Sequence, residues 1–341
     1  MTTVSATTHP TLLDYTKRQD PDKSIATIVE TLAQTNEVLE DMVHLEGNME
    51  TGHRTTIRSG LPAPTWRKLY GGVQPTKSET IQVTDTIGMM EAYAEVDKQL
   101  ADLNGNTAAF RMSEDMAHIE GMNQEFTKTL FYGDEGTDAE EFTGFRARFD
   151  DKTADVGNNI LSGETFGGTA ISGNTHSSIY LIVWGPNTCH GLYSKGSQMG
   201  LSKEDKGQVT IEDTTGNGGG RMEAYRTHYK WCCGLSVRDW RYIVRMQFQT
   251  TDLNANAGSG LDLVEMMSDA CELVPSLSFG RASFYCNRKT KQYLRRQFVD
   301  KVKQSTLGMD EIGGRSQLVF DGIPIRKVDA LLEDESPVTG L

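Results

Sequence analysis

The chain has 341 residues, a hydrophobic content of 37%, a mean hydropathy of −0.46 and a formal net charge of −13. No run approaches the roughly 18 apolar residues that a membrane-spanning helix needs, so we expect no membrane span. The negative charge argues against a sequence-specific DNA-binding protein, because such proteins gain affinity by neutralising phosphates with Lys and Arg. The five cysteines form no C-x-x-C pair and are expected to be reduced thiols.

Residues 1–10 are polar and lack the basic start and apolar stretch of a signal peptide, so we expect the protein to stay in the cytoplasm of the cell that makes it. Pro21 then favours the first position of a helix, which Gly47 is expected to end. The apolar face of this helix would contain Ile25, Ile28, Leu32, Leu39 and Met42. We interpret residues 1–49 as an amphipathic arm that needs a partner surface.

Residues 50–90 are predicted to form a long hairpin that extends from the rest of the chain. Prolines and glycines exclude a helix here, and short extended pieces are expected at 55–58, 66–69 and 80–87. A lone two-stranded hairpin is marginally stable in water. This segment therefore either packs on its own domain, lies on a neighbouring copy or forms a mobile surface hairpin.

A strand at 91–97 and a long helix beginning after Asn106 are predicted next. Asn106 suits an N-cap, and Gly133 suits a left-handed C-cap. About 26 residues at 1.5 Å each would give a helix roughly 39 Å long. The predicted buried face of this helix comprises Met112, Met116, Ile119, Phe126 and Leu130.

The remainder of the chain is predicted to be mixed helix and strand, giving an α+β fold. Loops are expected at 146–178, and short strands at 179–184 and 208–212. The stretch 221–249 alternates aromatic and basic residues, which predicts two paired antiparallel strands with one face exposed. Helices at 261–274 and 287–304 and a strand pair at 318–328, turning at Asp321-Gly322, complete the prediction.

No motif predicts catalysis, cofactor binding or metal binding. The glycines at 218–220 lack the Lys-Ser/Thr ending of a phosphate-binding loop, and the histidines show no metal-ligand spacing. Cys189 and His190 resemble a nucleophile and its base, but chain neighbours rarely face each other and no orienting acid is identifiable. We therefore expect a protein that is not an enzyme and needs no cofactor.

The predicted long helix and the segments after it resemble a known family. Its end, "FYGDEG", and the following "EEFTGF" are similar to the spine helix and the "G-x-G…P-x-G-L" segment of tailed-phage major capsid proteins with the HK97-like fold. The sequence departs at Glu141-Phe142, where many relatives have proline, and at Phe145, where leucine is usual. The segments "GHRTTIRSGLPAPTWRKL", "LIVWGPNTCHGLYSKGS" and "YRTHYKWCCGLSVRDWRYIVR" add to a similarity closest to the podovirus-type proteins.

This resemblance implies a domain layout. It consists of an N-terminal arm (1–49), an extended loop (50–90), a peripheral domain with the spine helix (91–150), an axial domain with interleaved peripheral-domain strands (151–316), and a C-terminal strand and tail (317–341).

It also implies the function: a structural protein that self-assembles as hexamers and pentamers into an icosahedral shell around double-stranded DNA. The implied partners are other copies, a portal protein at one vertex and a possible decoration or scaffold protein. DNA would be held without sequence-specific binding, no membrane is involved, and the location is the virion after synthesis in the bacterial host cytoplasm.

Two groups of residues are predicted to make intersubunit contacts. A large aromatic residue beside two cations suits an interface anchor in a region without a local core, which favours Trp66, Arg67 and Lys68. Arg295 and Arg296 lie on a basic helix that could be a nucleic-acid surface, but an exposed helix face is the favoured explanation. In a shell these cations would meet acidic loops of neighbouring copies. Two alternative functions stay open: an encapsulin-like nanocompartment shell and a cytosolic enzyme.

Overall fold

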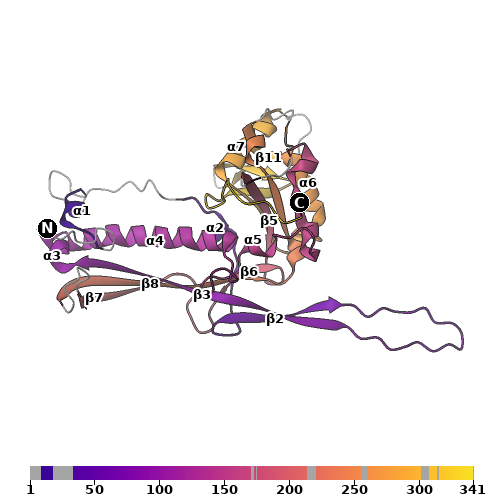
Figure 1. Ribbon diagram of the computed structural model, residues 1–341, viewed down its shortest axis with the longest axis horizontal. Helices are drawn as coiled ribbons and strands as arrows, with labels where there is room; N and C mark the ends of the chain where they lie inside the picture. Colours follow the sequence, from indigo (N-terminus) through magenta and orange to yellow (C-terminus); the bar gives the residue numbers. More distant parts are fainter. Residues whose placement is uncertain are drawn as a thin grey trace. The chain divides into compact units, whose positions relative to one another are not determined.

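A computed structural model describes residues 9–17, 34–169, 173, 175–212, 220–254, 260–300, 307–312 and 315–340. The described residues divide into two compact units. Unit 1 draws on Met1–Thr35, Met89–Thr127 and Gly200–Cys232, and unit 2 on Asn36–Gly88, Lys128–Met199 and Cys233–Leu341. Three elements contribute residues to both units: β3 (Glu79–Asp97), α4 (Thr107–Tyr132) and β8 (Arg221–Val237) (Figure 1). Among the described residues, no helix combines the length and apolar character needed to cross a membrane.

Unit 1 contains a small sheet in which charges on neighbouring strands neutralise each other. Strand β7 (Ser202–Glu212) pairs antiparallel with β8, which also neighbours β3 in this unit. The predicted strand at 91–97 is confirmed as part of β3. The basic face of β8 lies against acidic residues of β3, since Arg226 Nε is 2.5 Å from Glu95 Oε1 and Lys230 Nζ is 3.6 Å from Glu91 Oε1. The other helices of this unit are α1 (Leu12–Lys17), α3 (Lys98–Ala101) and the short η1 (Leu103–Gly105).

Helix α4 has the predicted length, but the predicted buried face is wrong in its first half. Met112 and Met116 are 65% and 60% exposed, and Ile119 is also exposed. The face that is buried instead begins at Phe110, passes through Asp115 and reaches Met122 before joining the predicted Phe126 and Leu130. Asp115 is tolerated there because Lys203 Nζ lies 2.7 Å from its carboxylate. A polar residue at a buried position therefore concealed the true apolar face.

Gly133 ends α4 as predicted, but for a different reason. It does not adopt the left-handed conformation, since it is absent from the glycines with positive φ. A Cβ at this position would instead lie 2.5 Å from Phe142 O and 2.6 Å from Thr129 O. Gly144 approaches the same turn, with a Cβ position 2.6 Å from Thr129 O. Both glycines allow the returning chain to cross the last turn of the helix at close range.

Unit 2 is built around β5 (His176–Trp184), a strand buried along its whole length. It pairs antiparallel with β10 (Arg281–Cys286) and β9 (Ile243–Gln249), and meets β6 (Cys189–Tyr193) at its end. The remaining strands are β1 (His44–Glu46), β2 (Gly52–Gly60), β4 (Ile160–Ser162), β11 (Leu307–Ile312), β12 (Arg315–Phe320) and β13 (Ile323–Lys327). Burial on both faces explains the continuous apolar run Ile179–Trp184, which predicted this strand correctly.

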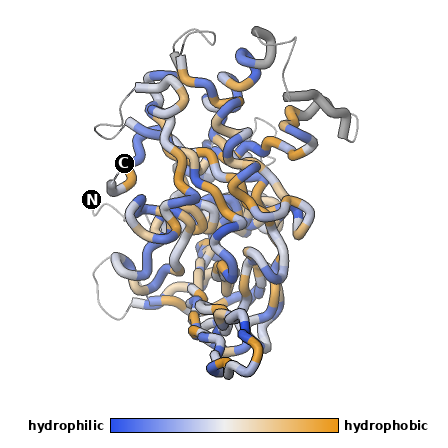
Figure 2. The backbone as a smooth tube through the Cα atoms, turned by 90° about the vertical axis from the view of Figure 1, so that its right-hand side faces the viewer, coloured by the Kyte–Doolittle hydropathy of each residue, from blue (hydrophilic) through white to orange (hydrophobic). Residues whose placement is uncertain are grey.

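Helices α6 (Leu263–Leu273) and α7 (Arg288–Asp300) contribute to the main core of unit 2 (Figure 1). Residues Met266 of α6, Leu294 of α7 and Leu181 of β5 belong to one buried cluster. Hydrophobic and hydrophilic residues alternate along much of the chain, as the tube in Figure 2 shows. The other helices are α2 (Val38–Asp41), α5 (Phe145–Arg148), η2 (Asp155–Asn159), η3 (Gly163–Phe166), η4 (Trp240–Tyr242), η5 (Thr250–Asn254) and η6 (Leu277–Phe279).

Several predicted elements differ from the structure. The strands in 221–249 exist but do not pair with each other, since β8 joins β7, β6 and β3 whereas β9 joins β5 and β4. No face of β9 is open, because Arg245 is completely buried. Residues 66–69 lie in the connection between β2 and β3 and form no strand. Strands β1, β4, β6, β10 and β11 were not predicted. The loops expected at 146–178 are interrupted by α5, η2, β4 and η3.

The predicted helix from Pro21 to Gly47 is wrong in its second half. Residues 18–33, which carry Ile25, Ile28 and Leu32, lie outside the described residues. After them the chain forms a bridge at Asn36, the short helix α2 and the strand β1. Asp41 explains the change, because it is buried and pairs with Arg281 at 2.7 Å and Arg326 at 3.1 Å. These long-range ion pairs hold α2 and β1 against the rest of unit 2.

Candidate intersubunit surfaces

The connection between β2 and β3 exposes the most conspicuous apolar surface of unit 2. The two strands pair antiparallel from Gly52↔Thr86 to Gly60↔Glu79, and the intervening residues are almost entirely exposed. The large apolar side chains there are Trp66 (101% exposed), Tyr70 (99%), Leu69 (89%) and Leu61 (80%). So many exposed apolar side chains in so short a segment indicate an interaction site.

The three residues predicted as contacts all lie in this connection. Trp66, Arg67 and Lys68 are exposed, and neither cation has an ion pair within the described residues. A turn follows them, in which Gly71 N donates to Lys68 O at 3.0 Å. Tyr70 adopts the left-handed conformation with φ of 64°, which is unfavourable for a residue with a side chain. The chain thus keeps two aromatic rings fully in solvent on either side of a pair of positive charges.

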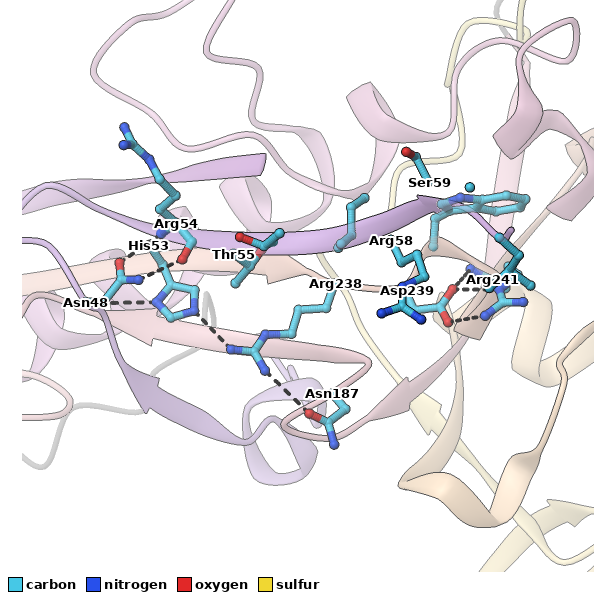
Figure 3. A pocket seen from close by; sticks show the side chains of 15 residues that line it. Asn48, His53, Arg54, Thr55, Arg58, Ser59, Asn187, Arg238, Asp239 and Arg241 are labelled. Atoms are coloured by element: carbon cyan, nitrogen blue, oxygen red, sulfur yellow. Dashed lines mark hydrogen bonds and ion pairs between the residues drawn. The ribbon is translucent and has the colours of Figure 1, made fainter. Parts of the chain in front are cut away.

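A basic cleft of about 910 Å³ lies along β2 of the same hairpin (Figure 3). Its lining includes Arg58 of β2, Arg238, and Arg241 next to Asp239. Arg241 forms two bonds to the Asp239 carboxylate, at 2.9 and 2.7 Å. Arg238 is held by uncharged groups, at 3.3 Å from His53 Nε2 and 3.4 Å from Asn187 Oδ1. The cleft therefore carries more positive than negative charge, in a chain whose net charge is −13.

His53 does not add to this positive charge at neutral pH. Burial lowers the pKa of its imidazole, and the nearby Arg238 guanidinium lowers it further. The cleft was missed at the sequence level because its arginines come from two segments that lie far apart along the chain. The local signals were Arg58 at the end of a predicted strand and the alternating aromatic and basic residues of 221–249.

The basic helix α7 divides into a paired part and an unpaired part. Arg288 Nη2 lies 2.9 Å from Asp329 Oδ2, and Lys289 Nζ lies 3.2 Å from Glu333 Oε2. These first-turn cations therefore bind the C-terminal segment of their own chain, in contrast to the expectation that they meet other copies. Arg295 and Arg296 are exposed and have no ion pair in the part of the chain that the structure describes.

The comparisons with known proteins decide the family. The family model described as "Major capsid protein GP7" matches residues 20–339. A chain in a near-atomic-resolution structure of bacteriophage Epsilon15 is 37% identical, with a TM-score of 0.81 and full coverage of both chains. The chain belongs to the major capsid protein GP7 family. It is the major capsid protein of a tailed phage, and its α+β fold is the predicted HK97-like capsid fold.

More distant structures are also similar. The capsid of bacteriophage JBD30 is 9% identical with a TM-score of 0.49, covering 88% of this chain and 93% of that one. An encapsulin from Synechococcus elongatus is 11% identical with a TM-score of 0.41, covering 65% and 91%. No curated protein matches. The family model and the Epsilon15 match favour a phage capsid protein over the nanocompartment alternative.

Cys189 and His190 do not form a nucleophile and base in this capsid protein. Both side chains are buried on β6, and adjacent residues of a strand point to opposite faces. Burial raises the pKa of the Cys189 thiol far above its usual value, and burial together with Arg238 lowers the pKa of His190 to about 4. The thiol stays protonated at neutral pH. Within the described ranges no cluster of three His, Cys, Asp or Glu side chains is arranged to hold a metal ion.

Proposed function

We propose that this capsid protein assembles as hexamers and pentamers into an icosahedral head that encloses double-stranded DNA. The observation that supports this most directly is the hairpin connection 61–78, whose apolar side chains have no core of their own. Burying a Trp or Leu side chain contributes about 1.5–3 kcal/mol. A neighbouring copy that covers this surface gains that stabilisation at every contact of the shell, and many such contacts act together.

The contact residues in this proposal are those expected from the sequence. Trp66, Arg67 and Lys68 lie on the exposed connection, and Arg295 and Arg296 form the unpaired part of α7. The aromatic ring supplies apolar area, whereas the cations select acidic surfaces of the partner copy. The extended loop at 50–90 is the limb that reaches the neighbour, and the arm at 1–49 is the second limb.

The proposal includes the other components of a phage head. One vertex holds a portal protein, and a decoration or scaffold protein assists where the shell needs one. The acidic chain encloses DNA without sequence-specific binding, since it has little charge with which to bind phosphates. It acts without catalysis or a cofactor, it does not involve a membrane, and it is made in the cytoplasm of the bacterial host.

Replacing Trp66 with Ala tests the hairpin contact. Because Trp66 is fully exposed in the subunit, the free energy of unfolding of the unassembled chain should change by less than about 0.5 kcal/mol. The shell should lose about 2 kcal/mol per contact and melt at a lower temperature in calorimetry. Trp66→Phe keeps an aromatic anchor and should retain part of the shell stability. An unchanged shell melting temperature in Trp66→Ala would contradict the contact.

Electron microscopy of the purified wild-type protein tests the shell itself. Closed particles with five-fold vertices are expected, and nuclease-protected double-stranded DNA should be found in particles from infected cells. Monomers or small oligomers at every concentration would contradict the proposal.

A further inference from the structure

The loop that follows α4 is the most acidic segment of the chain. Residues 134–141 contain five acids, Asp134, Glu135, Asp138, Glu140 and Glu141, and no basic residue occurs from 133 to 145. The stretch 135–140 is exposed throughout. The loop has internal order, since Asp138 N donates to Asp134 O at 2.9 Å and Gly136 N to Asp134 Oδ1 at 3.0 Å. Its negative charge is thus presented on a defined turn.

Two exposed acids of this loop, Asp138 and Glu140, are not neutralised by the described part of their own chain. Glu135 Oε2 accepts a hydrogen bond from the Thr86 hydroxyl at 3.0 Å, which fixes the loop beside β3. Asp138 and Glu140 make no ion pair within the described residues. Arg58 of the basic cleft has no ion pair there either, and Arg238 contacts only uncharged partners. Unit 2 therefore carries two acids of this loop and two arginines of the cleft that form no ion pair within the described residues.

We propose that the cleft lined by Arg58, Arg238 and Arg241 receives the acidic loop 134–141 of a second copy of the chain. This inference rests on the proposed function, because it names the contact that joins neighbouring copies. Cleft and loop are different surfaces, so the contact is heterologous and repeats head to tail. Such contacts close into rings when the rotation between copies allows it, as hexamers and pentamers require.

The shape of the cleft favours a protein loop over DNA as its occupant. Apolar side chains of Ile57, Leu61 and Trp240 line it together with the arginines. A loop with the exposed Ala139 between its acids offers both apolar and charged groups to such a lining. The phosphates of a duplex offer charge alone and are bound best by open cationic surfaces. DNA binding in the cleft remains an outcome that the test detects.

Two charge-reversal variants test the pairing. Arg58→Glu alters an exposed side chain of the cleft, and Asp138→Lys with Glu140→Lys alters two exposed side chains of the loop. Each should raise the protein concentration needed for capsomers by about tenfold or more, because like charges then face each other across the contact. Lys195→Glu with Glu164→Lys, also exposed, is the control and should assemble like the wild type. The full-length chains are compared by sedimentation and native mass spectrometry at equal salt.

Mixing the two variants gives the decisive result. The cleft of the Arg58→Glu variant accepts the lysine-bearing loop of the other variant, and a wild-type cleft accepts a wild-type loop, so the variants should form rings in which they alternate. Even-numbered rings such as hexamers are restored, whereas five-membered rings cannot alternate throughout. A folding defect or a contact within one chain would not be rescued by mixing.

The outcomes separate this inference from the proposed function. If the wild type and the control form shells and both reversal variants do so equally well, the pairing is wrong and the shell function stands. If assembly of Arg58→Glu is normal but its particles retain less DNA, the cleft binds nucleic acid and the pairing is also wrong. If the wild type never assembles, the proposed function itself fails.

Discussion

His190 is buried on β6 and has a pKa of about 4, far below the ordinary value of 6.5. Burial is the main cause, the positive charge of Arg238 and the neighbouring His53 lower it further, and Asp85 opposes them. These groups come from β2, β3 and the chain after β8, so their effect on His190 could not be predicted from its neighbours in sequence. In the sequence, His190 follows Cys189, which resembles a nucleophile beside its base. Both side chains are buried in the folded chain, so they do not form such a pair.

The depressed pKa predicts how stability depends on pH. Between about pH 6.5 and pH 4 the unfolded chain binds a proton at residue 190 that the folded chain does not, so stability falls as the pH falls through this range. The full loss is about 3 kcal/mol. Chemical unfolding at several pH values measures how the free energy of unfolding depends on pH. In His190→Asn this dependence should be weaker, by the equivalent of up to one proton taken up on unfolding. His53 keeps part of the slope in both proteins. Identical slopes would show that His190 is not neutral when folded.

At the scale of elements, periodicity and caps predicted where α4 begins and ends but not which face is buried. Phe126 and Leu130 were predicted correctly because they belong to both possible apolar faces of the helix. The faces diverge before Met122, where Lys203 of β7 neutralises the buried Asp115. That choice depends on a residue 88 positions away, which no local pattern contains. The hairpin strands were predicted from turn residues, whereas pairing across long connections, as between β9 and β5, was not.

Replacing Gly121 within α4 and Gly133 directly after it by alanine should change the free energy of unfolding in opposite directions. At Gly133 the new Cβ would lie 2.5 Å from Phe142 O and 2.6 Å from Thr129 O, and backbone atoms cannot easily move away. We expect Gly133→Ala to lower the free energy of unfolding by about 1–3 kcal/mol. Gly121 is exposed with nothing within 4 Å of its Cβ position, so Gly121→Ala should raise it by about 0.5–1 kcal/mol. Urea unfolding of the unassembled chains measures both, and a neutral Gly133→Ala would refute the close crossing.

At the scale of the whole molecule, the end of the chain completes the fold of unit 2. Glu335 forms a bridge with His176, and Val338 N donates to Gln247 Oε1 at 2.9 Å. The sequence wrongly predicted that one face of β9 is exposed, because arginine residues such as Arg245 usually lie at the surface. Its partner Glu335 lies 90 positions further along the chain, so only the folded chain shows that both are buried. Residues whose sequence pattern predicts solvent-facing charges can thus form a buried pair between distant segments of one unit.

The buried pair of Arg245 and Glu335 gives a prediction about the stability of the subunit. Arg245 Nη2 lies 2.9 Å from Glu335 Oε2, and the same carboxylate accepts from the hydroxyls of Ser178 and Tyr132, both at 2.5 Å. Glu335→Leu leaves the Arg245 guanidinium buried without its counter-charge and should lower the free energy of unfolding by about 3–5 kcal/mol. Adding Arg245→Met removes the uncompensated charge, so the double variant should be more stable than Glu335→Leu alone. Equilibrium unfolding of the wild type, both single variants and the double variant forms the cycle that measures this coupling. Additive losses would mean that the two side chains do not depend on each other.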